Sequence, residues 1–425
     1  MTKKSSTPAI RFKGFTDTWE QRELWELTIW DKKFNEVEAE KQPKIVKYPY
    51  VLADVFSKIE DASGDVRLLS TGNYIGYTTD EKAGKNLCVG EVVAIPWGGV
   101  PNIKYYKGKF VTADNRIATS NDTETLGNRF LSLYLEHSLA FLQSIYRGAS
   151  IKHPSMNDVL SMQISIPHIQ EQREIETWFA NLDNLITLHQ RKYDKLTNVK
   201  KSMLEKMFPK NGSNVPEIRF KGFTEAWEQR KAIDIADYSK GNGYSKGDLT
   251  DAGTPIILYG RLYTKYQFAI SEVDTFAFPR NGAVYSQGNE VIVPASGETA
   301  EDIARASAVE KSGVLLGGDL NILRPFDFIN PLFLALAISN GEPQKELAKK
   351  AQGKSVVHIH NTDIQEVTIA YPSRTEQDRI VSVFRQLDNL ITLHQCKFQI
   401  VSKQRKARLR RRAFEFTVIF ALIVL

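Results

Sequence analysis

The glycine-lysine-serine triplet at Gly353-Lys354-Ser355 is the first segment to test for chemistry, because such a triplet can close a phosphate-binding loop. A loop of the form G-x-x-x-x-G-K-[ST] needs another glycine five residues before the second one, and Ala348 occupies that position. The sequence also lacks a glycine-rich cofactor fingerprint between a strand and a helix, and it lacks an N-P-P-aromatic motif. We therefore predict no catalytic residue in this chain.

Metal-binding side chains are few. His189 and His394 occupy equivalent positions of an internal repeat. Two histidines without an acidic residue or a cysteine as further ligands make a poor zinc site. We expect them to be packed and hydrogen-bonded. The two cysteines, Cys88 and Cys396, exclude a disulfide framework and fit a reducing cytoplasm. We predict no metal and no cofactor on this chain.

Cations interleaved with aromatic side chains are typical of a surface that contacts nucleic-acid phosphates. One such run predicts contacts at Lys104, Tyr105, Tyr106, Lys107, Lys109, Asn115 and Arg116. A solvated hairpin in a turn-rich region is an alternative interpretation of the same residues. The net charge of +6 also favours a polyanionic partner, although charge alone is weak evidence.

A second run has its predicted contacts at alternate positions, which are Tyr259, Arg261, Tyr263 and Lys265. Alternation predicts that they share one face of a strand. Arg280 and Asn281 lie in a Pro-Arg-Asn-Gly turn, where their side chains can donate two hydrogen bonds to guanine or adenine. The sequence therefore predicts base contacts as well as phosphate contacts.

Internal repetition decides the architecture that positions these residues. Residues 10–16 and 19–22 recur as residues 218–224 and 227–230, and residues 182–190 recur unchanged as residues 387–395. A looser pair of loops links Gly148, Ser150, His153, Asp158 and Pro167 to Gly353, Ser355, His358, Asp363 and Pro372. The chain is thus two related halves in tandem.

The repeated loops supply the remaining predicted contacts, which are Arg147, Lys152, His153, Lys354 and His358. Residues that read a base sequence need not match between unlike readers, whereas these loops occupy like positions in both halves. We therefore expect the loops to position phosphates or to serve folding.

The bodies between the repeated segments, residues 23–147 and 231–352, show little mutual identity. Short β-rich runs are punctuated by glycine and proline, as in residues 91–96 and 289–294, and helical patches are expected at residues 130–145 and 331–350. This pattern predicts a small α+β domain in each half.

A long helix is expected after each body. Apolar residues at alternating three- and four-residue steps from Phe179 to Met207, and again from Phe384 to Val401, form a stripe typical of a coiled coil, and the two stripes are expected to pack antiparallel. Thr375 with Asp378 resembles a capping box. The predicted parts are residues 1–167, 168–210, 211–372, 373–413 and 414–425.

The C-terminus departs from the repeat. A basic run at residues 403–412 precedes an apolar stretch at residues 414–425, which is shorter than the roughly twenty residues of a membrane-spanning helix. A nucleic-acid or membrane tail and an altered C-terminus that weakens helix packing are both open interpretations. The start of the chain shows no apolar core of an export signal.

Together these motifs resemble the specificity subunits of type I restriction-modification systems, over nearly the whole chain. The resemblance rests on the F-K-G-F-T and W-E-Q-R opening, the glycine-serine-histidine loop followed by a proline, the E-Q-x-x-I and L-D-N-L-I segments, and their repetition. It implies a non-catalytic, cytoplasmic subunit whose two target recognition domains, separated by the two helices, each read half of a bipartite duplex DNA site.

The resemblance also implies partners. The helices are expected to set the spacing and to dock methyltransferase subunits, most simply two, and restriction subunits join through that complex. S-adenosylmethionine, ATP and Mg are expected on those partners, and no membrane is involved. The alternatives are a stand-alone two-domain DNA-binding regulator and an RNA-binding or scaffold protein.

Overall fold

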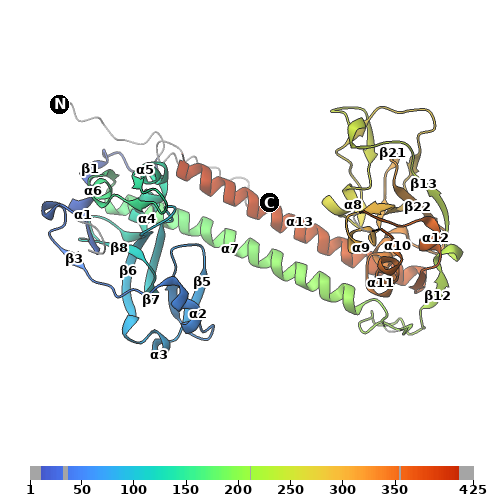
Figure 1. Ribbon diagram of the computed structural model, residues 1–425, viewed down its shortest axis with the longest axis horizontal. Coiled ribbons are helices and arrows are strands. Elements are labelled where there is room, and N and C mark those ends of the chain that lie inside the picture. Colours follow the sequence, from blue (N-terminus) through green and yellow to red (C-terminus); the bar gives the residue numbers. More distant parts are fainter. Residues whose placement is uncertain (1–10, 32–36, 211, 354–355, 411–425) are drawn as a thin grey trace. The chain divides into compact units, whose positions relative to one another are not determined.

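The computed structural model describes residues 11–31, 37–210, 212–353 and 356–410. The chain divides into two compact units, unit 1 with residues 1–188 and 397–425, and unit 2 with residues 189–396. Two long helices, α7 (Ile169–Lys206) and α13 (Arg374–Arg410), contribute residues to both units (Figure 1). The predicted α+β fold with two tandem domains and two long helices is confirmed.

A seven-stranded sheet with the order β3-β2-β8-β6-β7-β4-β5 forms the body of unit 1. Its strands are β2 (Thr28–Asp31), β3 (Ile45–Val46), β4 (Val66–Leu69), β5 (Ile75–Thr78), β6 (Cys88–Pro96), β7 (Lys104–Thr112) and β8 (Asn115–Ser120). Residues 92–96 of β6 are all buried, which explains their continuous apolar run. Helix α4 (Asn128–His137) packs on β6 through the buried side chain of Phe130.

Shorter elements complete unit 1. They are β1 (Glu20–Glu23), α1 (Leu24–Leu27), α2 (Phe56–Ile59), α3 (Asp80–Ala83), α5 (Leu139–Ser144), β9 (Tyr146–Arg147), β10 (His153–Pro154), α6 (Met156–Leu160) and β11 (Gln163–Ile166). Strand β9 pairs with β10, and β1 pairs with β11, in both cases antiparallel. These pairs connect the body to the start of α7.

The body of unit 2 is built on a five-stranded and a four-stranded sheet, with the orders β13-β22-β18-β20-β15 and β16-β14-β21-β17. The strands of the first are β13 (Ala236–Lys240), β15 (Ala269–Ile270), β18 (Glu290–Pro294), β20 (Ser307–Val309) and β22 (Leu320–Pro325). Those of the second are β14 (Thr254–Ile257), β16 (Phe276–Ala277), β17 (Tyr285–Gln287) and β21 (Ser312–Leu316). The two bodies thus differ in their sheets.

The other elements of unit 2 are β12 (Glu228–Lys231), α8 (Arg261–Thr264), β19 (Ser296–Gly297), α9 (Ala300–Ile303), α10 (Pro331–Ile338), α11 (Gly341–Lys350), β23 (Val357–His358), α12 (Asn361–Gln365) and β24 (Thr368–Tyr371). Helix α10 is apolar on all sides because it lies inside the core. The side chain of Asn330 caps it by accepting from the backbone nitrogens of Leu332 (2.8 Å) and Phe333 (3.2 Å).

The helical patches predicted for the bodies are present, but each consists of two helices. Residues 130–145 fall in α4 and α5, and residues 331–350 fall in α10 and α11. The chain turns at Gly341, the first residue of α11, whose positive φ of 67° favours glycine.

The repeated opening segments dock in the same way in both units. In unit 1, β1 pairs with β11 and the guanidinium of Arg11 donates to the carboxylate of Glu171 at 2.9 and 2.5 Å. In unit 2, β12 pairs with β24 and Arg219 donates to Glu376 at 2.7 Å through two nitrogens. These residues recur in the sequence because they build the same frame twice.

Within each unit, parts of α7 and α13 pack together, as the repeated apolar stripes predict. In unit 1, Phe179 and Leu182 of α7 share a core with Val401 and Leu409 of α13. In unit 2 the two helices run antiparallel, and the Nδ1 atoms of His189 and His394 lie 3.0 Å apart. These histidines are hydrogen-bonded to each other, as expected. The salt bridge of Lys200 to Asp388 (2.5 Å) follows further along the same helices.

Two expectations about α13 change. The helix begins at Arg374, and Asp378 accepts from Arg374 (3.0 Å) and from Asn330 (2.7 Å), so the predicted capping box is wrong. The basic run contacts unit 1 in part, because Leu409 is buried and Arg405 pairs with Asp183 and Glu136, whereas Lys403 and Lys406 are exposed. The apolar stretch at residues 414–425 lies outside the described residues. Within them, no helix has the length and apolar character to cross a membrane.

Candidate nucleic-acid interface

The first predicted run lies on β7, a long strand between β6 and β4. Tyr105 and Lys107 point to the same side, because alternate residues of a strand share a face. The hydroxyl of Tyr105 donates to Glu91 (2.9 Å), and Lys107 pairs with the same carboxylate (3.0 Å). Burial and the bond to Glu91 raise the pKa of Tyr105. Lys109 is engaged in a similar way, with Asp80 at 2.7 Å.

Asn115 and Arg116 are fully buried, so the prediction that they contact a nucleic acid is wrong. The amide of Asn115 donates to the carbonyl oxygen of Leu69 (2.9 Å). Arg116 donates to the carbonyl oxygen of Asp31 (2.6 Å) and forms a salt bridge with its carboxylate (3.2 Å). Burial lowers the pKa of Arg116, and Asp31 partly offsets that effect. Both side chains hold β8 in the sheet.

The glycines of the repeated loops have similar backbone geometry in both units. Gly148 and Gly353 have positive φ values of 144° and 134°. A Cβ atom on Gly148 would lie 2.2 Å from the carbonyl oxygen of Ile151, and one on Gly353 would lie 1.9 Å from that of Val356. Both loops therefore require glycine, which explains why the glycine recurs.

The loop histidines contact the segment that follows the central strand of each body. His153 donates through Nδ1 to the carbonyl oxygen of Trp97 (2.8 Å), and its ring lies 4.9 Å from the ring of Trp97. Nδ1 of His358 lies 3.0 Å from the hydroxyl oxygen of Ser296. These contacts indicate a folding role for both histidines, which was one of the two roles expected. Lys354 lies outside the described residues.

The other loop cations remain accessible. Arg147 and Lys152 are exposed, and Arg147 pairs with Asp158 at 2.9 Å. An exposed pair of this kind contributes little to stability, so a phosphate can replace the carboxylate at small cost.

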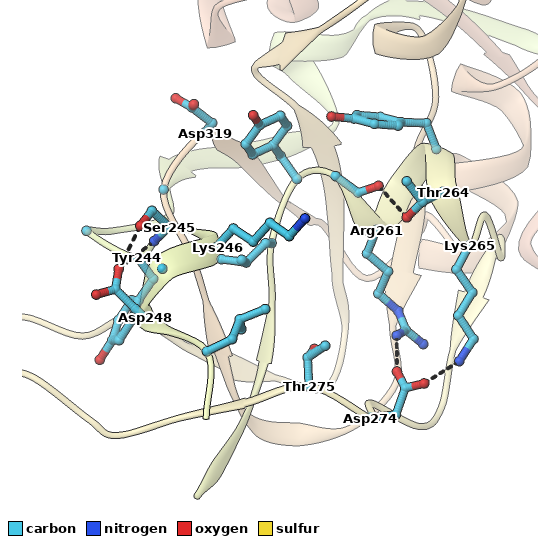
Figure 2. A pocket seen from close by; sticks show the side chains of 18 residues that line it. Tyr244, Ser245, Lys246, Asp248, Arg261, Thr264, Lys265, Asp274, Thr275 and Asp319 are labelled. Atoms are coloured by element: carbon cyan, nitrogen blue, oxygen red, sulfur yellow. Dashed lines mark hydrogen bonds and ion pairs between the residues drawn. The ribbon is translucent and has the colours of Figure 1, made fainter. Parts of the chain in front are cut away.

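The second predicted run lies at the wall of a pocket of about 990 Å³ in unit 2 (Figure 2). Tyr259, Arg261, Tyr263 and Lys265 line it. The strand predicted for these residues is wrong, because residues 261–264 form helix α8. Alternation of tyrosine and cation is compatible with a short helix when tertiary contacts, here the burial of Leu262, decide the backbone.

One carboxylate pairs with two of the cations that line this pocket. Asp274 pairs with Arg261 and Lys265, both at 2.5 Å, and these two contacts lower its pKa (Figure 2). Arg261 also donates to the carbonyl oxygen of Glu272 (3.0 Å), and its side chain is only 10% exposed. Arg261 therefore holds the pocket wall, while Lys265 stays accessible.

The predicted turn contacts border the same pocket. Arg280 pairs with Asp248, and its guanidinium lies 5.2 Å from the centre of the Tyr244 ring. Asn281 is exposed beside it. Tyr244 and Asp248 line the pocket, so both predicted segments of the second body meet at one place.

Sequence reasoning missed Arg67, Lys246 and the pocket carboxylates. Lys246 lines the pocket. Arg67 lies on β4 beside Tyr77, with 5.2 Å between its guanidinium and the ring centre. It is a single cation in an apolar strand, so no run of cations and aromatics marks it in the sequence. In the described ranges, no group of three or more metal-ligating residues occurs.

Comparison with known proteins gives a consistent result. The family described as "Type I restriction modification DNA specificity domain" matches residues 17–198 and 224–401. The type I restriction enzyme MjaVIII specificity subunit of Methanocaldococcus jannaschii is 22% identical over 294 residues, which are 64% of this chain and 67% of that protein.

A solved structure supports the fold. The S subunit of the type I restriction-modification system from M. genitalium superposes with a TM-score of 0.59 at 14% identity, over 97% of this chain and 100% of that one. The two family matches correspond to the two repeated halves and together span most of the sequence. The chain therefore belongs to the type I restriction-modification specificity family and carries two DNA specificity domains in tandem.

Proposed function

We propose that each unit reads one half of a bipartite duplex DNA site, and that α7 and α13 set the spacing between the halves. The observation that supports this proposal is a contrast between the docking contacts of the opening segments, called the frame, and the bodies. Both units dock their opening segment through the same arginine-glutamate pair, whereas their bodies have different sheets. Major-groove base edges differ for every base pair, so a changed body can read a changed sequence on a constant frame.

The proposed contact surface is the accessible part of the predicted set. In unit 1 it comprises Lys104, Tyr105, Tyr106, Lys107, Lys109, Arg147 and Lys152. In unit 2 it comprises Tyr259, Tyr263, Lys265, Arg280 and Asn281, with Arg261 as a positioning residue. Many of these cations pair with carboxylates, as Lys265 does with Asp274. DNA phosphates must compete with those carboxylates, which weakens binding to unspecific DNA.

The chain is a non-catalytic subunit in this proposal, and two methyltransferase subunits dock on its helices. Exposed apolar side chains support such docking, because neighbouring ones such as Leu390 and Leu393, three residues apart on α13, form a surface patch that a partner can cover. Leu188 on α7 and Leu393 on α13 are equivalent in the repeat, and each is 44% exposed. One docking position in each copy of the repeat favours two methyltransferase subunits.

Restriction subunits join through that complex, and S-adenosylmethionine, ATP and Mg belong to the partners. We place the complex in the cytoplasm. Buried Cys88 and exposed Cys396 form no disulfide bond in the part of the chain that the structure describes, which supports a reducing compartment.

The test is methyl transfer to duplex DNA by the purified chain, by the methyltransferase subunit and by their mixture. Only the mixture is expected to methylate, and only at one bipartite site. The variant pair Leu188→Asp and Leu393→Asp should lower the number of bound methyltransferase subunits from two to one each. Methylation by the isolated chain would contradict the proposal. Tight site-specific DNA binding without any methyltransferase association would favour a stand-alone regulator instead.

A further inference from the structure

Arg67 and Lys104 are two neighbouring cations of unit 1. In the part of the chain that the structure describes, the ammonium of Lys104 donates to the carbonyl oxygen of Thr71 (3.0 Å), and neither cation pairs with a carboxylate. Nη1 of Arg67 is buried and makes no hydrogen bond. The other cations on this strand differ, since Lys107 and Lys109 each have a carboxylate partner.

The two charges act on each other. Burial is the larger cause and the charge of Arg67 the smaller one that together lower the pKa of Lys104 to about 8. An ordinary lysine has a pKa near 10.4. The titratable groups that surround the pair are Tyr74 and Tyr77 on the β4–β5 side and Tyr106 on β7. Two acids belong to the same region, since Glu60 accepts a hydrogen bond from Tyr74 and Asp65 lies 3.7 Å from Lys109. Neither acid forms an ion pair with Arg67 or Lys104 among the residues that the structure describes, so the two cations lie together without a direct counter-charge.

Accessible tyrosines frame this pair. Tyr74 and Tyr77 are each 41% exposed, and the ring of Tyr77 lies against the guanidinium of Arg67. Half-buried cations beside exposed tyrosine side chains suit an anion that can accept several hydrogen bonds at once. A backbone phosphate of DNA has that chemistry.

We propose that Arg67 and Lys104 together bind a phosphodiester group of duplex DNA and so position unit 1 on its half-site. This inference rests on the proposed function, because it assumes that unit 1 faces DNA. Binding of the phosphate supplies the counter-charge that the pair lacks. The site is a positioning site, since a phosphate carries no base identity.

The experiment measures the affinity of the chain in complex with its methyltransferase subunits for a random-sequence duplex, over a series of salt concentrations. Arg67→Gln and Lys104→Gln should each lower the salt slope of log K by about 0.9, because each removes one phosphate contact. Lys58→Gln is the matched control, as Lys58 is an exposed lysine of the same unit that lies 3.8 Å from Asp54. Slopes equal to that of the control variant would overturn the inference.

A pH series separates a binding role from a merely structural one. The wild-type affinity should fall as the pH rises from 8 to 9.5, because Lys104 must take up a proton to bind the phosphate. Lys104→Arg keeps the charge at every pH of this range and should remove that fall while retaining the affinity. A pH dependence that Lys104→Arg leaves unchanged would contradict the inference.

Inorganic phosphate, at the same ionic strength as a chloride control, distinguishes the source of the anion. DNA should remain the preferred ligand. Removal of the pH dependence by inorganic phosphate alone would indicate a small-anion site and overturn the inference. If the wild-type complex itself binds no duplex, the proposed function fails and not only this site.

Discussion

Arg219 and Glu376 join the opening segment of unit 2 to the start of α13 through two hydrogen bonds of 2.7 Å each, and the Glu376 side chain is only 1% exposed. Arg219→Met leaves that carboxylate buried without its partner. We expect a loss of about 3–5 kcal/mol in the free energy of unfolding, measured by urea denaturation. The control Lys345→Met, in an exposed pair with Glu342, should cost less than about 1 kcal/mol. Equal losses would contradict the account.

The loop glycine gives a second prediction. Gly353→Ala should destabilise unit 2 by about 1–3 kcal/mol, because the new Cβ would meet the carbonyl oxygen of Val356 at 1.9 Å in a backbone of positive φ. Gly222→Ala is the matched control, since Gly222 also has a positive φ (99°) but no atom within 4 Å of its Cβ position. Thermal unfolding should show a larger drop for Gly353→Ala than for the control. The reverse order would refute the loop geometry.

Lys104 predicts a stability that depends on pH. Its folded pKa of about 8 lies below its unfolded value near 10.4, so the unfolded state binds more protons between these two values. The destabilisation caused by the buried charge of Lys104 is complete below pH 8 and decreases as the pH rises toward 10.4. Lys104→Met should therefore raise the urea midpoint at pH 7, and the gain over wild type should shrink by pH 10. A gain that stays constant with pH would show that Lys104 has an ordinary pKa.

The apolar stripe of α7 predicts a contrast between two leucines of one helix. Leu182→Asp should cost several kcal/mol, because Leu182 is 6% exposed in the core of unit 1 and the new carboxylate would have no partner there. Leu188→Asp, at a position 44% exposed, should change the free energy of unfolding by less than about 1 kcal/mol. Similar losses at both positions would mean that α7 does not pack as described.

The sequence predicts the frame well because repetition exposes it. Arg11 and Arg219 recur with Glu171 and Glu376, and a charge that recurs with a partner at the same place is a signal that one sequence can show. The stripe of α7 is equally visible, since an apolar residue at every third or fourth position has few other meanings.

The contact surface is predicted less well, because burial depends on distant segments. In the sequence Arg116 is typical of an exposed cation. In the structure it is buried and pairs with Asp31, which lies far away in the chain. Arg261 starts a helix in a segment whose alternation favours a strand. The sequence does not mark Arg67 as a contact residue, because it is a single cation in an apolar strand. Only the pairing of β4 with β7, which are distant in the sequence, brings Lys104 near it.

The most direct test of the two-reader account replaces residues 23–147 with the matching body of a related chain and maps the methylated sites, with the methyltransferase subunits supplied. The frame of unit 1 remains, because Arg11, Glu171 and the α7 stripe lie outside the exchanged segment. The account predicts that one half of the recognised site changes and that the other half persists. A simultaneous change in both halves would contradict the claim that each unit reads on its own.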